Sequence, residues 1–350
     1  MKKRVMIAMS GGVDSSVAAY LMQQAGYECI GATMLLCGKA LTGKDADSAD
    51  ARAVAERLGI PFYEFYAMDL FCRQVVDPFI RVYADGGTPN PCVVCNKAIK
   101  FGHLLKLALD MGCSHVVTGH YALIEQKDDR YMIRKGPDEA KDQSYFLAGL
   151  SQEQLSHILF PLGELTKEQV RQIAQQQGFI NAQKKDSQDI CFIPDGDYYE
   201  FIKRYTGKDF PCGAFLDRDG KAVGTHKGAM AYTLGQRKGL GLAMGAPVYV
   251  TGKDMKENTV TVGPENALFT DTLIANDLNW MPFPALTEPM KVTAKARSRH
   301  KAQKATIYPE GDQVRVVFDE PQRALTPGQA VVFYDGDWVV GSGTITDVIY

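Results

Sequence analysis

Hydrophobic and polar positions in the first third of the chain follow two alternating patterns. Short apolar runs rich in β-branched and aromatic residues predict buried strands at 4–9, 27–34, 62–67 and 115–119. Between these runs, apolar side chains recur every three or four positions and predict helices at 14–24, 48–58, 70–83 and 97–111. Strands that alternate with helices are typical of a parallel sheet with helices on its faces, so we expect an α/β domain.

The pattern changes near residue 200 to short strands interrupted by glycine and proline. Alternating apolar and polar residues at 291–299, 313–318 and 330–334 predict antiparallel strands, which commonly close into a barrel. We therefore predict three domains: an α/β domain at 1–197, a small central connector domain at 198–266, and a C-terminal antiparallel β-barrel-like domain at 267–350.

The composition narrows the class of protein. The 350 residues are 45% hydrophobic and 23% charged, a balance that excludes intrinsic disorder. No apolar run approaches the ~18 residues of a membrane span, and the run after the N-terminal basic residues is too short for a secretory signal. We therefore expect a cytoplasmic protein with no membrane partner. In that compartment the eight cysteines stay reduced and indicate chemistry or metal binding more than structural disulfides.

A glycine-rich loop, Ser10 to Ser16, follows the first predicted strand. Its glycines let backbone N–H groups approach an anion, and its hydroxyls add donors at a helix start. The spacing is neither that of the Walker A loop nor that of the dinucleotide fingerprint. It resembles the PP-loop, SGG-x-DS, of enzymes that split ATP into AMP and pyrophosphate. The alternative is an ordinary strand-to-helix turn capped by serine and aspartate.

Three cysteines occur in segments that indicate chemistry. Cys92 and Cys95 form a C-x-x-C in a proline-stiffened loop, and Cys191 lies among polar residues at the predicted domain junction. We expect Asn96 to cap the helix from residue 97, which would put Cys95 near a positive helix end and Lys100 and favour its thiolate. One C-x-x-C without a second pair is a weak zinc signal. The remaining cysteines are predicted to be structural or incidental: Cys29, Cys37, Cys72, Cys113 and Cys212.

A basic segment, residues 291–304, contains six Lys/Arg residues and no acidic residue, although the formal charge of the whole chain is −2. As one strand with a period of two, it would carry a row of cations suited to RNA phosphates. That row comprises Lys291, Lys295, Arg297, Arg299 and Lys301. The alternative is a solvated edge strand that its charges protect from aggregation. The pattern alone leaves both open.

Seven motifs together resemble the bacterial tRNA-specific 2-thiouridylases, the MnmA family. They are SGGVDSS, TPNPCVVCNKAIKFG, VVTGHYA, KDQSYFLAGL, DSQDICFI, YTLGQRKGLG and LTPGQAVVFY, spread from residue 10 to residue 334. The resemblance implies an N-terminal PP-loop ATP-pyrophosphatase domain, a central connector and a C-terminal β-barrel. It also implies a tRNA sulfurtransferase that converts ATP to AMP and pyrophosphate. That enzyme would replace the 2-oxygen of the wobble uridine of the tRNAs for Lys, Glu and Gln by sulfur, giving 2-thiouridine.

The same resemblance implies roles for particular residues. Cys191 would carry a persulfide, and Cys95 would be its partner nucleophile, with a transient Cys95–Cys191 disulfide that is reduced for the next turnover. ATP would contact Ala8, Met9, Ser10, Gly11, Gly12, Val13, Asp14, Ser15, Met34 and Gly119. The flipped target base would contact Asn90, Pro91 and Cys92. The tRNA would contact His120, Lys141, Asp142, Gln143, Arg297, Ser298 and Gln329.

Several points stay open at this level. Many members of the family have aspartate, suspected of acid/base work, where this chain has Cys92. Cys92, Cys95 and Cys191 could instead ligate an iron–sulfur cluster, as proposed for related thiolases. Mg²⁺ is expected with ATP, but no residue is named as its ligand. The sulfur donor would be a cysteine desulfurase or a sulfur-relay carrier.

Two other functions are alternatives to the thiouridylase hypothesis. An amidotransferase or ligase acting on a small carboxylate would leave the basic segment and the paired cysteines unexplained. A non-catalytic RNA-binding or iron–sulfur module would leave the nucleotide loop unexplained.

Overall fold

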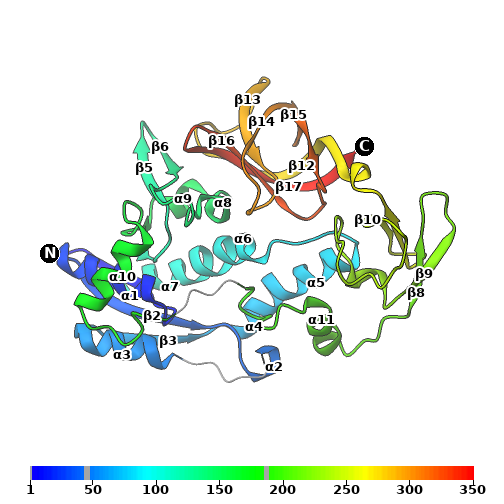
Figure 1. The fold of residues 1–350 in the computed structure, drawn as a ribbon. Helices are drawn as coiled ribbons and strands as arrows, with labels where there is room; N and C mark the ends of the chain where they lie inside the picture. The colour runs from blue at the N-terminus through cyan, green and yellow to red at the C-terminus, as the bar shows by residue number, and fades with distance from the viewer. Residues whose placement is uncertain (1, 43–47, 185–188) are drawn as a thin grey trace.

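The computed structural model describes residues 2–42, 48–184 and 189–350 (Figure 1). The first part of the chain contains a five-stranded sheet in the order β3-β2-β1-β4-β7, with every pair parallel. Its strands are β1 (Arg4–Ala8), β2 (Glu28–Leu35), β3 (Phe62–Tyr66), β4 (His115–Val117) and β7 (Ile158–Leu159). The predicted α/β domain is therefore confirmed.

Helices cover the two faces of this sheet. They include α1 (Val13–Gln24), α3 (Ala49–Leu58), α8 (Ser144–Leu147), α9 (Gln152–Leu155) and α10 (Lys167–Gln176), and a short helix, α2 (Lys39–Thr42), follows β2. A continuous helical run joins α4 (Met68–Phe71), the π-helical turn η1 (Cys72–Val76) and α5 (Asp77–Ala84). A second run joins α6 (Pro91–Cys95), the π-helical η2 (Asn96–His103) and α7 (Leu104–Asp110).

The start of the second helical run corrects the sequence prediction. The helix expected from residue 97 begins at Pro91, and the side chain of Asn90 accepts a hydrogen bond from Val93 N at 3.5 Å. Proline is favoured in a first helical turn because that turn needs no N–H from it, and asparagine is a preferred cap. Asn96 is therefore inside the run, and the cap is Asn90.

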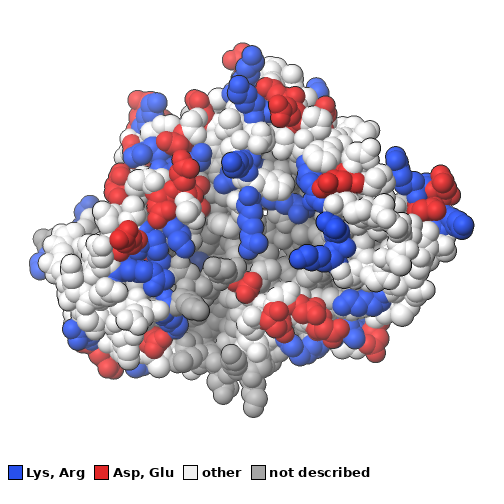
Figure 2. Space-filling view, viewed as in Figure 1, with Lys and Arg blue, Asp and Glu red and all other residues white. Residues whose placement is uncertain are grey.

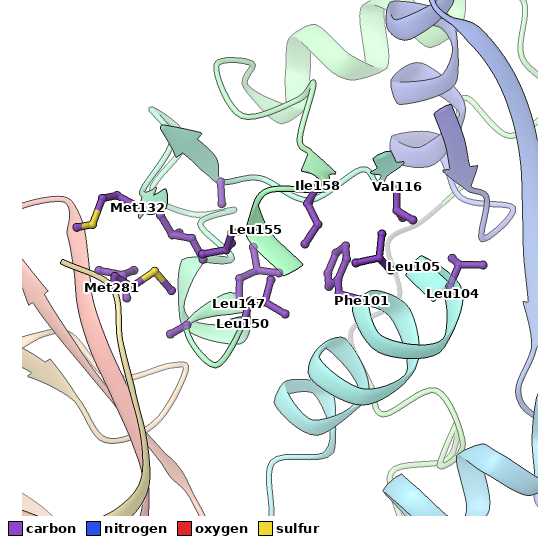
Figure 3. Close-up of a cluster of buried hydrophobic side chains, with 14 of the residues drawn as sticks. Phe101, Leu104, Leu105, Val116, Met132, Leu147, Leu150, Leu155, Ile158 and Met281 are labelled. Atoms are coloured by element: carbon purple, nitrogen blue, oxygen red, sulfur yellow. The ribbon is translucent and has the colours of Figure 1, made fainter. Parts of the chain in front are cut away.

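Alternate residues of β1 pack on opposite faces of the sheet. Val5 and Ile7 are buried with α1 on one face. Met6 is buried on the other face with Phe101 and Leu104, in a cluster that continues through the first domain (Figure 3). That cluster includes Met281, which Figure 3 labels, and Val332 and Val339 of the C-terminal part, so one apolar core joins the first and last parts of the chain.

The middle part contains α11 (Tyr198–Thr206) and a four-stranded sheet in the order β10-β11-β8-β9. Its elements are β8 (Gly213–Leu216), β9 (Ala222–His226), η3 (Ala229–Ala231), β10 (Tyr249–Asp254), β11 (Thr259–Gly263) and η4 (Glu265–Leu268). Phe215, Val250 and Val260 bury the inner face of this sheet in a cluster that also contains Phe79 of α5. The middle part therefore packs on the helical run of the first domain.

The C-terminal strands close on themselves. Their order is β12-β15-β14-β13-β16-β17, and β17 pairs back with β12, which makes the barrel that the sequence predicted. The hairpin of β5 (Leu123–Lys127) and β6 (Arg130–Arg134) extends the sheet from the first domain. The barrel strands are β12 (Phe269–Trp280), β13 (Met290–Lys295), β14 (Gln303–Glu310), β15 (Gln313–Arg323), β16 (Ala330–Asp335) and β17 (Trp338–Ile349). No helix in the described part of the chain is long and apolar enough to cross a membrane.

Candidate active site and nucleic-acid interface

The glycine-rich loop connects β1 to α1 at the carboxyl edge of the parallel sheet. Gly11 has φ +71°, a conformation that glycine adopts without steric cost, and Gly12 precedes α1 without a side chain over the helix start. Inside the loop, Ser10 N donates to Ser15 Oγ at 3.2 Å, and Ser15 Oγ donates to Gly12 O at 3.1 Å.

The other predicted ATP-binding residues come from neighbouring strands of the same edge. Met34 lies near the end of β2, and Met9 N donates to Ala32 O of that strand at 2.8 Å. Gly119 follows β4 on the other side, where a Cβ would lie 2.7 Å from the Asp14 carbonyl carbon. Only glycine therefore fits at 119. The loop lies where β1 is flanked by β2 and β4, the topological switch point at which open α/β sheets bind ligands.

Three polar residues that the sequence reasoning missed hold this loop. Lys167 Nζ lies 2.7 and 2.8 Å from the two carboxylate oxygens of Asp14. Asn181 Nδ2 and Lys184 Nζ donate to the carbonyl of Gly11 at 3.1 and 3.3 Å. Their sequence separation from the loop exceeds 150 positions, so only the packing of α10 and of the segment after it on the loop and α1 reveals them.

The predicted thiols lie near one another. Cys92 and Cys95 are on α6, Cys191 interacts electrostatically with both, and Lys100 acts on all three. Cys92 and Cys191 are exposed, whereas Cys95 is buried, and none is in a disulfide. Although Cys92 is exposed as a residue, protein atoms around its sulfur partly desolvate the thiol, which raises its pKa.

The expectation of a Cys95 thiolate is wrong. Burial raises the pKa of the Cys95 thiol to about 12, although Lys100 opposes that shift. The physical reason is the helix start at Pro91, which puts Cys95 beyond the first turn and into the core beside Phe192. Cys95 is therefore a neutral thiol in the reduced protein.

Cys191 is the thiol whose ionisation the site favours. A hydrogen bond from Cys37 lowers the pKa of Cys191 to about 7, and Lys100 and the backbone N–H groups of Cys191 and Phe192 add to this against partial burial. Cys37 follows β2 closely and so lies at the carboxyl edge of the sheet.

The residues predicted for the target base begin α6. Asn90 caps this helix, Pro91 is buried at its start, and Cys92 is exposed on its first turn. The loop before them rests on the C-terminal barrel, because Gln329 Nε2 donates to the carbonyls of Thr88 and Pro89 at 2.9 and 3.2 Å. Gln329 is buried, and its amide holds the loop that precedes Asn90.

The predicted tRNA contacts of the first domain are mostly engaged within the protein. His120 is buried, its Nδ1 lies 2.7 Å from Thr118 Oγ1, and burial holds its pKa well below the ordinary value. The backbone N–H of Lys141 donates to the carbonyl of Asp138. The carboxylate of Asp142 accepts bonds from Ser144 N and Oγ, both at 3.0 Å. Gln143 Oε1 accepts from Tyr121 N at 2.9 Å.

The row of five cations predicted along one strand is wrong. β13 ends at Lys295, and the chain turns between 296 and 302 before β14 begins. Arg297 points inward, where its Nη2 donates to Ala324 O at 2.8 Å and Thr326 Oγ1 at 2.6 Å, and Ser298 lies half-buried in the turn. A strand cannot continue here because the chain must reverse to form the β13–β14 hairpin.

The exposed part of the segment remains basic. Its exposed cations are Lys291, Arg299, Lys301 and Lys304. Figure 2 shows Lys and Arg side chains beside the hollow in the middle of the face that carries α6 and the barrel. A polyanion could therefore approach α6 along a positively charged surface.

The three site cysteines do not meet as a metal-binding group. Within the described ranges, no cluster of three His, Cys, Asp or Glu side chains is placed to hold a metal ion. The thiols thus interact electrostatically without converging on one point. The first part of the DSQDICFI motif, residues 186–188, lies outside the described residues.

Comparisons with known proteins agree with this arrangement. Three family models match: the tRNA methyl transferase HUP domain at 3–195, the tRNA methyl transferase PRC-barrel domain at 199–264 and the aminomethyltransferase beta-barrel domain at 270–345. The tRNA-specific 2-thiouridylase MnmA of Clostridium acetobutylicum is 49% identical, covering 99% of this chain and 100% of that protein. Its counterpart in Acetivibrio thermocellus is also 49% identical, covering 98% and 99%.

Solved structures are more distant. The U34-tRNA thiolase NcsA from Methanococcus maripaludis with its [4Fe-4S] cluster has a TM-score of 0.36 and 17% identity, covering 59% of this chain and 70% of that one. A 4-thiouridine synthetase in complex with RNA and ATP has a TM-score of 0.36 and 14% identity, covering 59% and 50%. The full-length similarity to the bacterial proteins is what assigns the family: the chain belongs to the tRNA-specific 2-thiouridylases of the MnmA family, which are ATP-using PP-loop sulfurtransferases.

Proposed function

We propose that this protein replaces the 2-oxygen of the wobble uridine in the tRNAs for Lys, Glu and Gln by sulfur, using ATP and a persulfide on Cys191. The observation that carries the proposal is that Cys191, whose thiol pKa is lowered to about 7, interacts electrostatically with both α6 cysteines. The full-length identity to proteins named as thiouridylases supports it.

The first step is activation of the uridine. The 2-carbonyl oxygen attacks the α-phosphorus of ATP, the bond to the β-phosphate breaks, and pyrophosphate leaves. The backbone N–H groups at Gly11 and Gly12 and the start of α1 stabilise the departing anion. Mg²⁺ would accompany the phosphates, but Lys167 and Tyr121 already occupy the carboxylate of Asp14, so we name no protein ligand for the ion.

The second step transfers sulfur. The terminal sulfur of the Cys191 persulfide attacks carbon 2 of the adenylated uridine, and AMP leaves with the former 2-oxygen. Cys95 then attacks Cys191 Sγ, the S–S bond to the nucleotide breaks, and 2-thiouridine is released as a Cys95–Cys191 disulfide forms. An external thiol reductant returns both cysteines to the reduced state. Because Cys95 is buried and neutral, its proton must leave before or during this attack.

The base and the tRNA are placed by different parts of the molecule. The start of α6 is a stiff, capped surface against which a flipped uridine can lie. It is formed by Asn90, Pro91 and Cys92. The exposed cations of the basic segment give the anticodon arm a positive surface. The raised pKa of Cys92 fits a neutral thiol that donates a hydrogen bond to the base. A cysteine desulfurase or a sulfur-relay carrier would load Cys191.

The proposal is tested by anaerobic thiolation of unmodified tRNA transcripts for Lys, Glu and Gln with ATP and a persulfide donor. We expect 2-thiouridine, with pyrophosphate release that depends on tRNA. Cys191→Ala should abolish thiolation but retain pyrophosphate release, and Cys212→Ala, an exposed thiol outside the site, should resemble the native enzyme. Full thiolation by Cys191→Ala would refute the sulfur-carrier role. Pyrophosphate release without tRNA would favour a small-molecule ligase.

The cluster alternative on Cys92, Cys95 and Cys191 has its own readout. Iron and sulfide are quantified in the same anaerobic preparations, native and Cys92→Ala. We expect thiolation without stoichiometric iron. Iron bound in proportion to activity, and lost together with it in Cys92→Ala, would contradict the persulfide mechanism.

A further inference from the structure

The YTLGQRKGLG motif, residues 232–241, is one of the seven sequence motifs, and the proposed reaction gives it no task. It forms the first part of the connection between η3 and β10, and we call it the YTLGQRKGLG loop. Arg237 and Lys238 in its middle are exposed, whereas Tyr232 and Leu240 near its ends are buried. The loop therefore presents two adjacent cations to solvent from an anchored base.

The chain around this loop carries charge of one sign. Residues 221–253 contain five Lys or Arg residues and no acidic residue, although the formal charge of the whole chain is −2. Figure 2 shows Lys and Arg side chains between the hollow and the middle part of the chain. A polyanion that lies over the hollow would therefore meet cations of the middle part as well as those of the barrel.

Hydrogen bonds hold the loop in one conformation. Gly235 N donates to Val250 O of β10, and Val250 N donates to Gln236 O, both at 2.9 Å. The side chain of Gln236 closes the turn, because its Oε1 accepts from Thr233 N at 3.1 Å and its Nε2 donates to Lys238 O at 3.0 Å. A preorganised loop loses little conformational entropy when it binds a ligand, which favours a binding role for its exposed cations.

The same loop packs on the barrel at the segment that Arg297 contacts. Arg323 Nη2, at the end of β15, donates to Gly235 O at 3.2 Å. A Cβ on Gly235 would lie 2.9 Å from Ala324 Cβ, so the two backbones are in close contact. Ala324 O in turn accepts from Arg297 Nη2 at 2.8 Å. The YTLGQRKGLG loop and the basic segment therefore meet at the end of β15.

The barrel segment after β15 continues to the loop that precedes Asn90. Thr88 N donates to Pro327 O at 2.9 Å, and Gln329 Nε2 donates to the carbonyls of Thr88 and Pro89. One run of contacts thus leads from the YTLGQRKGLG loop, through the end of β15, to the start of α6. An RNA whose target uridine lies at α6 would have this scaffold beside it.

We propose that the YTLGQRKGLG loop is a second tRNA-contacting element, in which Arg237 and Lys238 bind backbone phosphates of the bound tRNA. The inference rests on the proposed function, because it takes the target uridine to lie at the start of α6. Phosphate contacts position an RNA without reading its sequence, so the loop should act equally on the tRNAs for Lys, Glu and Gln. The alternative is a solvated loop whose charges serve only solubility.

The experiment measures binding of unmodified tRNA transcripts to the full-length protein over a range of salt concentrations. Arg237→Ala and Lys238→Ala should each raise the Kd about threefold to tenfold and lower the slope of log affinity against log salt by about 0.7–0.9. The KM for tRNA should rise, and saturating tRNA should restore the native thiolation rate. Lys238→Arg should keep the native affinity, since it retains the charge.

The matched control is Lys221→Ala. It removes one exposed cation of the same acid-free stretch, but in the turn of the β8–β9 hairpin, where the backbone N–H of Lys221 donates to Asp217 Oδ1. We expect native affinity and native salt slope in this variant. An equal loss in Lys221→Ala would show a general effect of charge and would contradict a contact at the loop.

A second measurement uses the native protein. Exposed lysines are acetylated in a short pulse with an N-hydroxysuccinimide ester, with and without unmodified tRNA, and the modified peptides are quantified by mass spectrometry. We expect tRNA to protect Lys238 and to leave Lys221 as reactive as before.

The outcomes separate this inference from the proposed function. Native affinity and salt slope in both alanine variants, or equal labelling of Lys238 with and without tRNA, overturns the role of the loop and leaves the proposed function standing. A native protein that binds no tRNA overturns both.

Discussion

Lys167 of α10 places its ammonium 2.7 Å from one carboxylate oxygen of Asp14 and 2.8 Å from the other. Asp14 belongs to the first turn of α1, directly behind the glycine loop. The lysine side chain is only 11% exposed and that of the aspartate 30%. This ion pair therefore fixes the helix start at which the nucleotide phosphates are proposed to bind.

Lys167→Ala should lower the free energy of unfolding by about 1–3 kcal/mol, because it leaves a partly buried carboxylate without its cation. It should also weaken ATP binding, since the freed negative charge lies beside the phosphates. Urea unfolding and equilibrium ATP binding measure the two effects. Lys203→Ala, which removes solvent-accessible ion pairs with Glu200 and Asp209, should change stability much less. Equal effects of the two variants would contradict the structural role of Lys167.

Gln329 connects the barrel to the loop before Asn90. Its substitution should therefore affect placement of the target uridine more than binding of ATP. Gln329→Ala removes the donor to two loop carbonyls, and we expect the kcat/KM for tRNA thiolation to fall about 10- to 100-fold. The affinity for ATP should remain unchanged. Gln322→Ala, whose amide donates to the nearby Glu320 carbonyl, is the control. A loss of ATP affinity equal to the loss of thiolation would show general destabilisation instead.

The ionisation of Cys191 predicts a pH profile for its alkylation. The thiolate is the reactive form and is populated above the pKa, so the rate with iodoacetamide should rise with a midpoint near the pKa of about 7. Lys100→Met should move the midpoint upward by roughly one pH unit, because it removes a cation that favours the thiolate. Lys97→Met should leave it in place, since Lys97 pairs with Asp277.

Cys95 provides the internal comparison for that profile. Its pKa is raised to about 12, so it should resist alkylation throughout the range in which Cys191 reacts. Peptide mass spectrometry after a short pulse at pH 8 distinguishes the two sites. Preferential labelling of Cys95 would overturn the assignment of the thiolate.

The two arginines of the turn after β13 should behave differently. Arg299 is exposed, and Arg299→Ala should weaken tRNA binding and reduce the slope of log affinity against log salt by about 0.7–0.9. Arg297→Ala should instead lower the free energy of unfolding by about 1–3 kcal/mol, because it removes the donor to Ala324 and Thr326. Salt titrations of tRNA binding and urea unfolding check the pair. Unchanged affinity and slope in Arg299→Ala would show that the basic segment contributes to solubility and not to tRNA binding.

The sequence by itself determined the features that depend on neighbouring residues. Alternating apolar patterns indicated the parallel sheet and the barrel, because strand and helix periods are local properties. The loop from Ser10 to Ser16 indicated the nucleotide site, because its glycines, hydroxyls and helix start are contiguous. The motifs spread along the chain were enough to indicate the family.

Only the tertiary structure decided which groups carry charge and which contact one another. The pKa of a thiol depends on burial and on partners distant in sequence, so the pKa of Cys191 is lowered to about 7 whereas that of Cys95 is raised to about 12. Arg297 turns inward because the chain reverses after β13, which a period of two could not reveal. The contact of Lys167 with Asp14 likewise spans 153 positions and exists only because α10 packs on α1.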